Sequence, residues 1–216
     1  MKKIVAVMPI KLQNERLPGK NTKELAGKPL IQYSLDTLLK IEELDSINVF
    51  CSDESICEYL PDGVQFIRRS VDLDKSTSNF TQIFDSFRQV KEADIYVYAH
   101  ATAPYVSYET MKECIDAVVS GKYDSAFCAV KIQDYLWKNG NPLNFDATNL
   151  PRSQDIEPIY RETSGVYVFT KEVFETYKRR IGVLPYIKEV SFVESIDINN
   201  PEDFVLAEQM NKYYER

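Results

Sequence analysis

Cationic side chains are concentrated in one short stretch of this acidic chain. Residues 10–23 contain Lys11, Arg16, Lys20 and Lys23 against a single glutamate, a local charge of +3 in a chain whose net charge is −7. A concentrated positive patch attracts anionic ligands, so a polyanionic substrate is one interpretation. Lysines that simply face solvent in a loop are the other, and charge alone does not separate the two.

The position of this basic turn favours the substrate interpretation. It follows the apolar run 4–8, which is typical of a buried strand, and it precedes a helix that we expect to run from Pro29 to Leu39. Open α/β sheets hold phosphates beyond the ends of their strands, where a helix begins after a turn. We therefore predict a strand, a phosphate-binding turn and a helix in this order.

The sequence of the turn resembles the signature of the sialic-acid-type cytidylyltransferases, which activate nonulosonic and related 3-deoxy sugar acids as CMP-sugars. The matching segments are 9–11, 15–21 and 27–31, which read Pro-Ile-Lys, Glu-Arg-Leu-Pro-Gly-Lys-Asn and Gly-Lys-Pro-Leu-Ile. Two departures stand out. Lys11 replaces an arginine and loses its bidentate fork, and residues 12–14 (Leu-Gln-Asn) replace small residues, which leaves fewer free backbone amides for a phosphate.

The resemblance implies a reaction in which a sugar hydroxyl attacks the α-phosphorus of CTP and pyrophosphate leaves. Such a transfer depends on in-line positioning and on neutralising phosphate charge. We predict that Lys11, Arg16 and Lys20 hold the triphosphate as catalytic residues. Pro9 and Asn21 are predicted to contact the nucleotide.

Further nucleotide contacts are expected after two later strands. By the resemblance, Arg69 lies near the cytosine, and Ser76 and Ser78 match a passage that lines the nucleotide pocket. A surface ion pair and plain helix capping are the alternatives. His100, the only histidine, replaces a family glutamine after the run 95–99. An ordinary pKa near ~6.5 would let it act as a base, whereas a polar contact or a structural role is the alternative.

Residues expected to bind the sugar acid come from two motifs. Thr102 lies in a His-Ala-Thr-Ala-Pro segment at a strand end, where ligands gather in such sheets. Arg152, Gln154 and Tyr160 resemble the family's Arg-x-Gln-Asp and Tyr-Arg motifs. A guanidinium would match the carboxylate of the sugar with two parallel hydrogen bonds. An ion pair between Arg152 and a neighbouring acid, which pins the loop, is the alternative.

A metal site is predicted near the C-terminus. The resemblance implies magnesium, with manganese as an alternative, held by two carboxylates on alternate residues of a strand in a Ser-Ile-Asp-Ile-Asp run. Here the run ends in Asn199, so Asp197 keeps its carboxylate and the second ligand is a neutral amide. Asp197 is also predicted to be catalytic. The alternative is that Asn199 only begins the cap of the last helix.

Alternating strand and helix patterns predict an α/β fold with a doubly wound, mostly parallel, Rossmann-like sheet in a single domain over residues 1–216. The run 195–198 reads as the final strand, and Pro201 begins the closing helix with Asn200 as its cap. The passage 133–161 is irregular, because its prolines break every helical period. The resemblance implies that this excursion contributes to the interface of a homodimer and to the sugar site.

Composition excludes several other classes of protein. A sequence pI near 4.9 argues against nucleic-acid binding, and no apolar stretch approaches the ~20 residues of a membrane helix. The N-terminus lacks the pattern of a signal peptide, so we expect a cytoplasmic protein. The four cysteines show no CxxC spacing and read as reduced core residues rather than zinc ligands.

Two rival functions stay open at this stage. One is nucleotidyl transfer to an acceptor other than a nonulosonate. The other is a catalytically weak cytidine-nucleotide-binding module, which the departures at Lys11, residues 12–14 and Asn199 motivate. The segments around Thr102 and Arg152 are somewhat closer to the branch that handles pseudaminic-type sugars.

Overall fold

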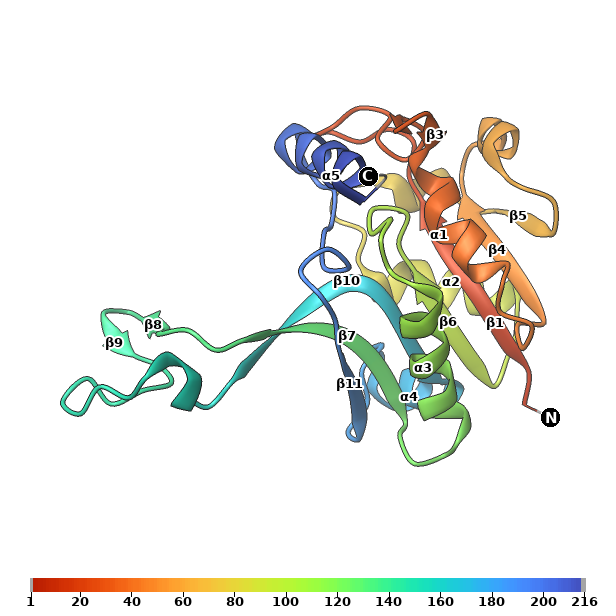
Figure 1. Ribbon diagram of the computed structural model, residues 1–216. Coiled ribbons are helices and arrows are strands. Elements are labelled where there is room, and N and C mark those ends of the chain that lie inside the picture. Colours follow the sequence, from red (N-terminus) through yellow and green to blue (C-terminus); the bar gives the residue numbers. More distant parts are fainter. Residues whose placement is uncertain (1, 215–216) are drawn as a thin grey trace.

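A computed structural model describes residues 2–214, which form a seven-stranded sheet with helices on both faces (Figure 1). The strand order is β11-β7-β10-β6-β1-β4-β5. Parallel pairing joins β1 to β4 and β6, β4 to β5, and β7 to β11, whereas β10 is antiparallel to both neighbours. The strands are β1 Ile4–Ile10, β4 Ser46–Cys51, β5 Val64–Arg68, β6 Ile95–Ala99, β7 Ser125–Ile132, β10 Ile159–Thr170 and β11 Pro185–Glu189.

Five α-helices and several short elements complete the described chain. The α-helices are α1 Leu30–Leu38, α2 Phe80–Val90, α3 Tyr108–Val119, α4 Lys171–Tyr177 and α5 Pro201–Tyr214. Two small hairpins pair β2 Glu24–Leu25 with β3 Lys28–Pro29, and β8 Trp137–Lys138 with β9 Asn141–Pro142. Short 3-10 helices span Glu54–Tyr59, Val71–Asp74 and Ser153–Asp155. Within residues 2–214, none of the helices is both long and apolar enough to cross a membrane.

The two faces of β1 belong to different cores, because successive side chains of a strand point to opposite sides. Ala6 and Met8 join a cluster that includes α1 and α3, whereas Val5 and Val7 join an aromatic cluster that includes α2 and α4. A sheet covered on both sides is the doubly wound, mostly parallel arrangement expected from the sequence. That prediction of fold class is confirmed.

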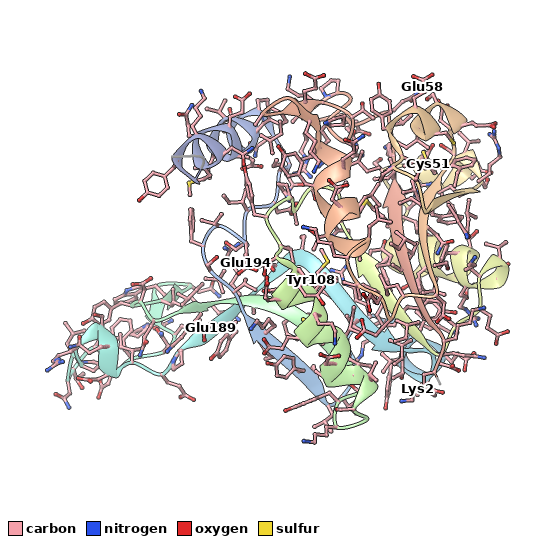
Figure 2. The ribbon with its side chains drawn as sticks, turned by 45° about the vertical axis from the view of Figure 1, so that its right-hand side comes forward. Lys2, Cys51, Glu58, Tyr108, Glu189 and Glu194 are labelled. Atoms are coloured by element: carbon pink, nitrogen blue, oxygen red, sulfur yellow. The ribbon has the colours of Figure 1, made fainter. Side chains whose placement is uncertain are left out.

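Side-chain caps fix where three helices begin. Asn79 caps α2 in a reciprocal arrangement with Gln82, and Ser107 caps α3 by accepting from the Thr110 amide at 3.2 Å. Asn200 accepts from the Asp203 amide at 3.0 Å, so the predicted cap of α5 is confirmed. The half-buried carboxylate of Glu194 accepts hydrogen bonds from the Ser107 and Thr110 hydroxyls, which ties the chain before α5 to the start of α3 (Figure 2).

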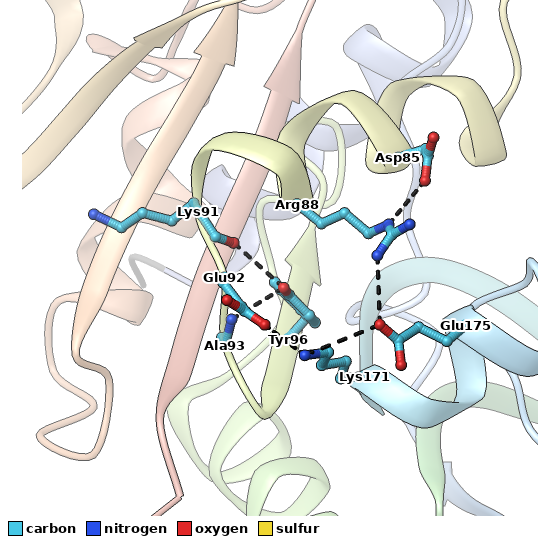
Figure 3. Close-up of polar contacts among 8 residues, drawn as sticks. All are labelled: Asp85, Arg88, Lys91, Glu92, Ala93, Tyr96, Lys171 and Glu175. Atoms are coloured by element: carbon cyan, nitrogen blue, oxygen red, sulfur yellow. Dashed lines mark hydrogen bonds and ion pairs between the residues drawn. The ribbon is translucent and has the colours of Figure 1, made fainter.

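A second polar network lies at the amino edge of the sheet. Lys171 contacts Glu92 and Glu175, and Arg88 contacts Asp85 and Glu175, so α2 is joined to α4 (Figure 3). The Tyr96 hydroxyl accepts from the Ala93 amide at 3.0 Å. This edge is opposite the end of β1 from which the basic turn leaves, so the network braces the fold away from that turn.

Three sequence expectations were wrong. The run 195–198 is not a strand: Ser195 belongs to a turn, and Ile196 and Ile198 lie in irregular chain and pack against α5. The last strand of the sheet is β11 instead. Cys57 is exposed rather than part of the core. The apolar period of the helix after residue 79 predicts that Val90 is buried, but its side chain is 61% exposed at the end of α2.

The passage between β7 and β10 extends away from the sheet as an arm (Figure 1). Within the arm, the Phe145 ring contacts Tyr135 at 5.0 Å and Trp137 at 5.4 Å between centroids. Gln133 donates to the carbonyls of Gln154 and Ile156 at 2.9 and 3.0 Å, which closes the base of the arm. The arm therefore has its own small aromatic core.

Candidate active site

A hollow of about 250 Å³ lies between the basic turn and the chain before α5. Its lining residues are Lys11, Asn14, Glu15, Arg16, Leu17, Lys20, Ser76 and Asn199. All three predicted triphosphate-binding cations thus border one cleft. Below, this hollow is called the cationic cleft.

Asn199 joins the two walls of the cationic cleft. Its Oδ1 accepts from Arg16 Nη2 at 2.9 Å and lies 3.4 Å from Lys20 Nζ. Its Nδ2 donates to Asp197 Oδ2 at 2.8 Å, and Lys20 Nζ also donates to the Ile198 carbonyl at 2.9 Å. One amide side chain therefore connects two cations to a carboxylate from the far end of the sequence.

The chain before α5 is held in this place by its own backbone and by burial. The Ile198 amide donates to the Thr102 carbonyl at 2.8 Å, which fixes the segment against the loop after β6. Asp203 Oδ2 accepts from the amides of Asn199 and Asn200 at 2.8 and 3.0 Å. Because the backbone is bonded on both sides, the side chain of Asn199 has a defined direction.

Lys20 is partly withdrawn from water. Burial lowers its pKa, and the nearby Arg16 acts in the same direction, whereas the carboxylates of Asp197 and Asp203 raise it. An anionic ligand in the cationic cleft would favour the charged ammonium further. A bound phosphate would therefore stabilise the charged form of Lys20.

Two predicted nucleotide contacts on the turn have structural roles instead of lining the cleft. Asn21 is buried, and its Nδ2 donates to the Lys11 carbonyl at 2.9 Å, so its amide holds the turn together. Pro9 lies within β1, opposite Phe50 of β4. Lys11 itself borders the cleft, with its Nζ 4.0 Å from Glu15.

The residues predicted after β5 divide between the cleft and the protein interior. Ser76 lines the cationic cleft, whereas Ser78 donates to the Asp72 carbonyl at 3.3 Å. The Arg69 side chain is 2% exposed and forms a buried ion pair with Asp74 at 2.5 Å. The ion pair that was considered for Arg69 is therefore present, but the arginine lies inside the protein and not on the surface. Asp74 lies between Arg69 and the solvent.

His100 follows β6 and is oriented by the backbone. Its Nδ1 lies 2.5 Å from the Ser164 carbonyl, which can only accept, so Nδ1 carries the proton and Nε2 is an acceptor. Burial and the charge of Arg180 lower its pKa to about 4. The ring is neutral at pH 7 and is a weak base, which favours a polar contact over proton abstraction.

The predicted sugar-binding residues do not meet in the cationic cleft of this chain. Thr102 lies in the loop that bonds Ile198. Arg152, Gln154 and Tyr160 are exposed on or beside the arm, and Arg152 Nε lies 3.5 Å from Asp155. The alternative considered for Arg152, an ion pair with a neighbouring acid within the loop, is therefore observed.

Sequence reasoning missed Asn14, Glu15 and Asp74 as residues that border hollows near the turn. Asn14 was read only as part of the departure at residues 12–14, and Glu15 only as part of the matching segment 15–21. Asp74 carried no motif, and its proximity to the turn depends on the path of the chain after β5.

The donor set near Asn199 fits a divalent cation only in part. Within residues 2–214 there is no cluster of three or more histidine, cysteine or acidic side chains that could hold a metal. Asp197 Oδ1, however, is buried and has no hydrogen-bond partner among the described residues, whereas Asn199 Oδ1 is already bonded to Arg16. Because magnesium commonly takes one or two carboxylates plus substrate phosphates, Asp197 alone can serve as its protein ligand.

The lowered pKa of His100 predicts a specific acid sensitivity. Between about pH 4 and pH 6.5 the unfolded chain binds a proton on this ring and the folded chain does not, so stability falls as the pH drops through this window. We expect His100→Gln to remove about 3 kcal/mol of the acid-induced loss in unfolding free energy. Urea denaturation at pH 7 and pH 4 measures it, and equal losses in both proteins would contradict the account.

Comparison with known proteins agrees with this geometry. The chain matches the cytidylyltransferase family over residues 5–216. An N-acylneuraminate cytidylyltransferase from Oncorhynchus mykiss is 29% identical over 203 residues, which are 89% of this chain and 46% of that protein. A CMP-N,N'-diacetyllegionaminic acid synthase from Legionella pneumophila is 26% identical over 226 residues, with 96% of each chain covered. This chain therefore spans about half the length of the first relative and nearly all of the second.

A solved structure with the same fold is that of a CMP:2-keto-3-deoxy-manno-octonic acid synthetase complexed with CTP. It superposes with a TM-score of 0.73 at 17% identity, over 98% of this chain and 99% of that chain. At that identity the likeness establishes the fold alone. The match over residues 5–216 shows that the chain belongs to the cytidylyltransferase family.

Proposed function

We propose that this chain transfers CMP from CTP to a nonulosonic sugar acid of the sialic, pseudaminic or legionaminic type and releases pyrophosphate. The observation that carries the proposal is the cationic cleft, where Arg16 and Lys20 meet Asn199 and Asp197 in a member of the cytidylyltransferase family. The names of the relatives from Oncorhynchus and Legionella support the class of acceptor.

The cleft suits the charge changes of this reaction. The hydroxyl oxygen of the sugar forms a bond to the α-phosphorus and its proton passes to solvent. The bond from that phosphorus to the bridging oxygen breaks, and the electron pair leaves with pyrophosphate. Arg16 and Lys20 would exchange their contacts with Asn199 for phosphate oxygens, which neutralises the leaving group. His100 Nε2 would accept a hydrogen bond from a substrate hydroxyl.

The direct test is pyrophosphate release with each of CTP, UTP, GTP and ATP, combined with a panel of sugar-acid acceptors. We expect turnover with CTP and a nonulosonic acid. Turnover with CTP and only a different acceptor would move the protein to another nucleotidyl transfer. Binding of CTP without turnover on any acceptor would favour a nucleotide-binding module.

Replacing Lys20 tests the role of the cleft. We expect Lys20→Ala to lower kcat/KM for CTP by about 100-fold, because a charged hydrogen bond to the leaving group is lost. Lys23→Ala is the matched control, since Lys23 lies in the same turn but outside the residues that line the cleft. Unchanged activity of a folded Lys20→Ala protein would remove this lysine from the machinery.

We also propose that magnesium, with manganese as a substitute, assists the reaction and that Asp197 holds it together with the triphosphate. The ion would neutralise phosphate charge. Asn199, as it lies, orients Asp197 through its Nδ2 and leaves Asp197 Oδ1 without a protein partner among the residues described.

Asn199→Asp tests this arrangement. An aspartate cannot donate to Asp197 Oδ2, so two carboxylates would face the cleft and we expect tighter binding of manganese by about fivefold or more. Titration calorimetry with the ion and the metal dependence of the rate measure the effect. Asn200→Asp is the control, because aspartate also caps a helix. No gain in either affinity or rate would count against the assignment.

A homodimer formed through the arm is the third part of the proposal. The arm exposes large apolar side chains, including Trp137 at 59% and Leu150 at 63%, which a monomer would leave in water. Arg152 and Gln154 also lie on the arm and not in the cleft of their own chain. A partner's arm would supply them to the sugar site, as the family resemblance implies.

Leu150→Glu tests the dimer. A buried charge at the interface would shift the sedimentation coefficient from dimer to monomer and raise the KM for the sugar while CTP binding is retained. Val90→Glu adds the same charge at a similarly exposed position of α2 and should leave both unchanged. A wild-type protein that sediments as a monomer at assay concentration would overturn this part.

A further inference from the structure

A second hollow of about 440 Å³ adjoins the cationic cleft. Its lining residues are Lys11, Leu12, Gln13, Asn14, Glu15, Pro18, Gly19 and Asp74. Lys11, Asn14 and Glu15 border both hollows, so the two lie side by side. A nucleotide whose phosphates occupy the first would extend its nucleoside into the second, where Leu12 and Pro18 provide apolar walls.

Asp74 is a fixed hydrogen-bond acceptor in this second hollow. Its Oδ1 accepts from Arg69 Nε at 3.2 Å and from Arg69 Nη2 at 2.5 Å, and its Oδ2 accepts from the Ser52 hydroxyl. The side chain of Arg69 is 2% exposed, whereas that of Asp74 is 22% exposed. A ligand therefore meets the carboxylate, and the arginine behind it sets the direction of that carboxylate.

The hollow offers a second acceptor that lacks a donor. Asn14 Oδ1 is buried and has no hydrogen-bond partner among residues 2–214. Leaving a buried acceptor unpaired is costly, so a ligand that fits here brings N–H or O–H donors. A nucleoside with an exocyclic amino group and ribose hydroxyls has this chemistry.

A neighbouring hollow on the other side of Asp74 is a poorer place for a nucleotide. It is bordered by Asp53 and Glu54 as well as Asp74, and Arg68 and the buried Arg69 offset only two of these three carboxylates. The remaining negative charge would disfavour a polyphosphate. Among the described residues, this hollow shares no lining side chain with the cationic cleft, whereas the hollow with Asn14 shares three.

We propose that Asp74, positioned by Arg69, accepts a hydrogen bond from the 4-amino group of cytosine and so selects CTP over UTP. Uracil would place a carbonyl oxygen against the carboxylate, where two acceptors repel. This inference rests on the proposed function, because it assumes that a pyrimidine nucleotide occupies the cleft. It adds the residue that distinguishes one pyrimidine from the other.

The test is direct binding by titration calorimetry of CTP and UTP, without an acceptor sugar. We expect the wild type to bind CTP about 30-fold or more tightly than UTP, as a hydrogen bond to a charged group would give. In Asp74→Asn the amide can turn its N–H donor toward the uracil oxygen. The preference for CTP over UTP, measured as the ratio of their affinities, should therefore fall to about threefold or less. Asp72→Asn, an exposed acid two residues earlier, should keep the wild-type ratio.

A second measurement uses only the wild type, because Asp74→Asn also removes the buried ion pair with Arg69. The wild type is titrated with the triphosphate of 4-deamino-cytidine (pyrimidin-2-one riboside), which lacks the amino group but has no oxygen in its place. We expect binding about tenfold or more weaker than that of CTP. Equal binding of the two would overturn the inference, and so would an unchanged ratio in a folded Asp74→Asn protein.

The two levels of failure are distinguishable. If the wild type binds neither CTP nor UTP, the proposed function fails and the inference fails with it. If CTP binds at the cationic cleft and base preference ignores both Asp74 and the amino group, only the inference fails.

Discussion

The contact between Asn199 and the two cations Arg16 and Lys20 is the interaction on which the site depends. It joins a turn near residue 16 to a segment near residue 199, beside the bond from Lys20 Nζ to the Ile198 carbonyl. Without it, two positive side chains would repel each other across an open cleft. With it, the neutral amide of Asn199 accepts hydrogen bonds from both cations and donates one to Asp197.

The rest of the fold positions the two partners of this contact. On one side, β1 is buried on both faces and delivers the basic turn at its carboxyl end, where Asn21 closes the turn from within. On the other side, the bond from Ile198 to the loop after β6 and the cap of α5 fix the backbone of Asn199. Both walls are rigid, so the cleft is preorganised for an anion.

Local sequence patterns were sufficient for the elements whose burial is periodic. The continuous apolar run of β1 predicts a strand buried on both faces, and the apolar stripe of α1 predicts a helix buried on one face. The run 195–198 misled for the same reason: its apolar residues alternate, yet Ile196 and Ile198 are buried by α5 and the start of α1 and not by a neighbouring strand. A period of apolar residues indicates that they are buried, but it does not indicate which element packs against them.

Side-chain pairing was the part of the site that sequence could not supply. Arg69 resembles a nucleotide-contacting arginine, but its guanidinium is taken up by Asp74, and nothing in the order of residues fixes that pairing. The arm shows the same limit, since Arg152 pairs with Asp155 and does not line the cationic cleft of its own chain. By contrast, Lys20 and Asp197 were predicted together, and the structure brings both to the surroundings of Asn199.

The most direct measurement of the central claim is a crystal structure of the protein soaked with CTP and a divalent ion. The account predicts triphosphate oxygens within hydrogen-bond distance of Arg16 Nη2 and Lys20 Nζ, with the ion between the phosphates and Asp197. Electron density for the nucleotide outside the cleft, with the contacts of Asn199 to both cations intact, would contradict it.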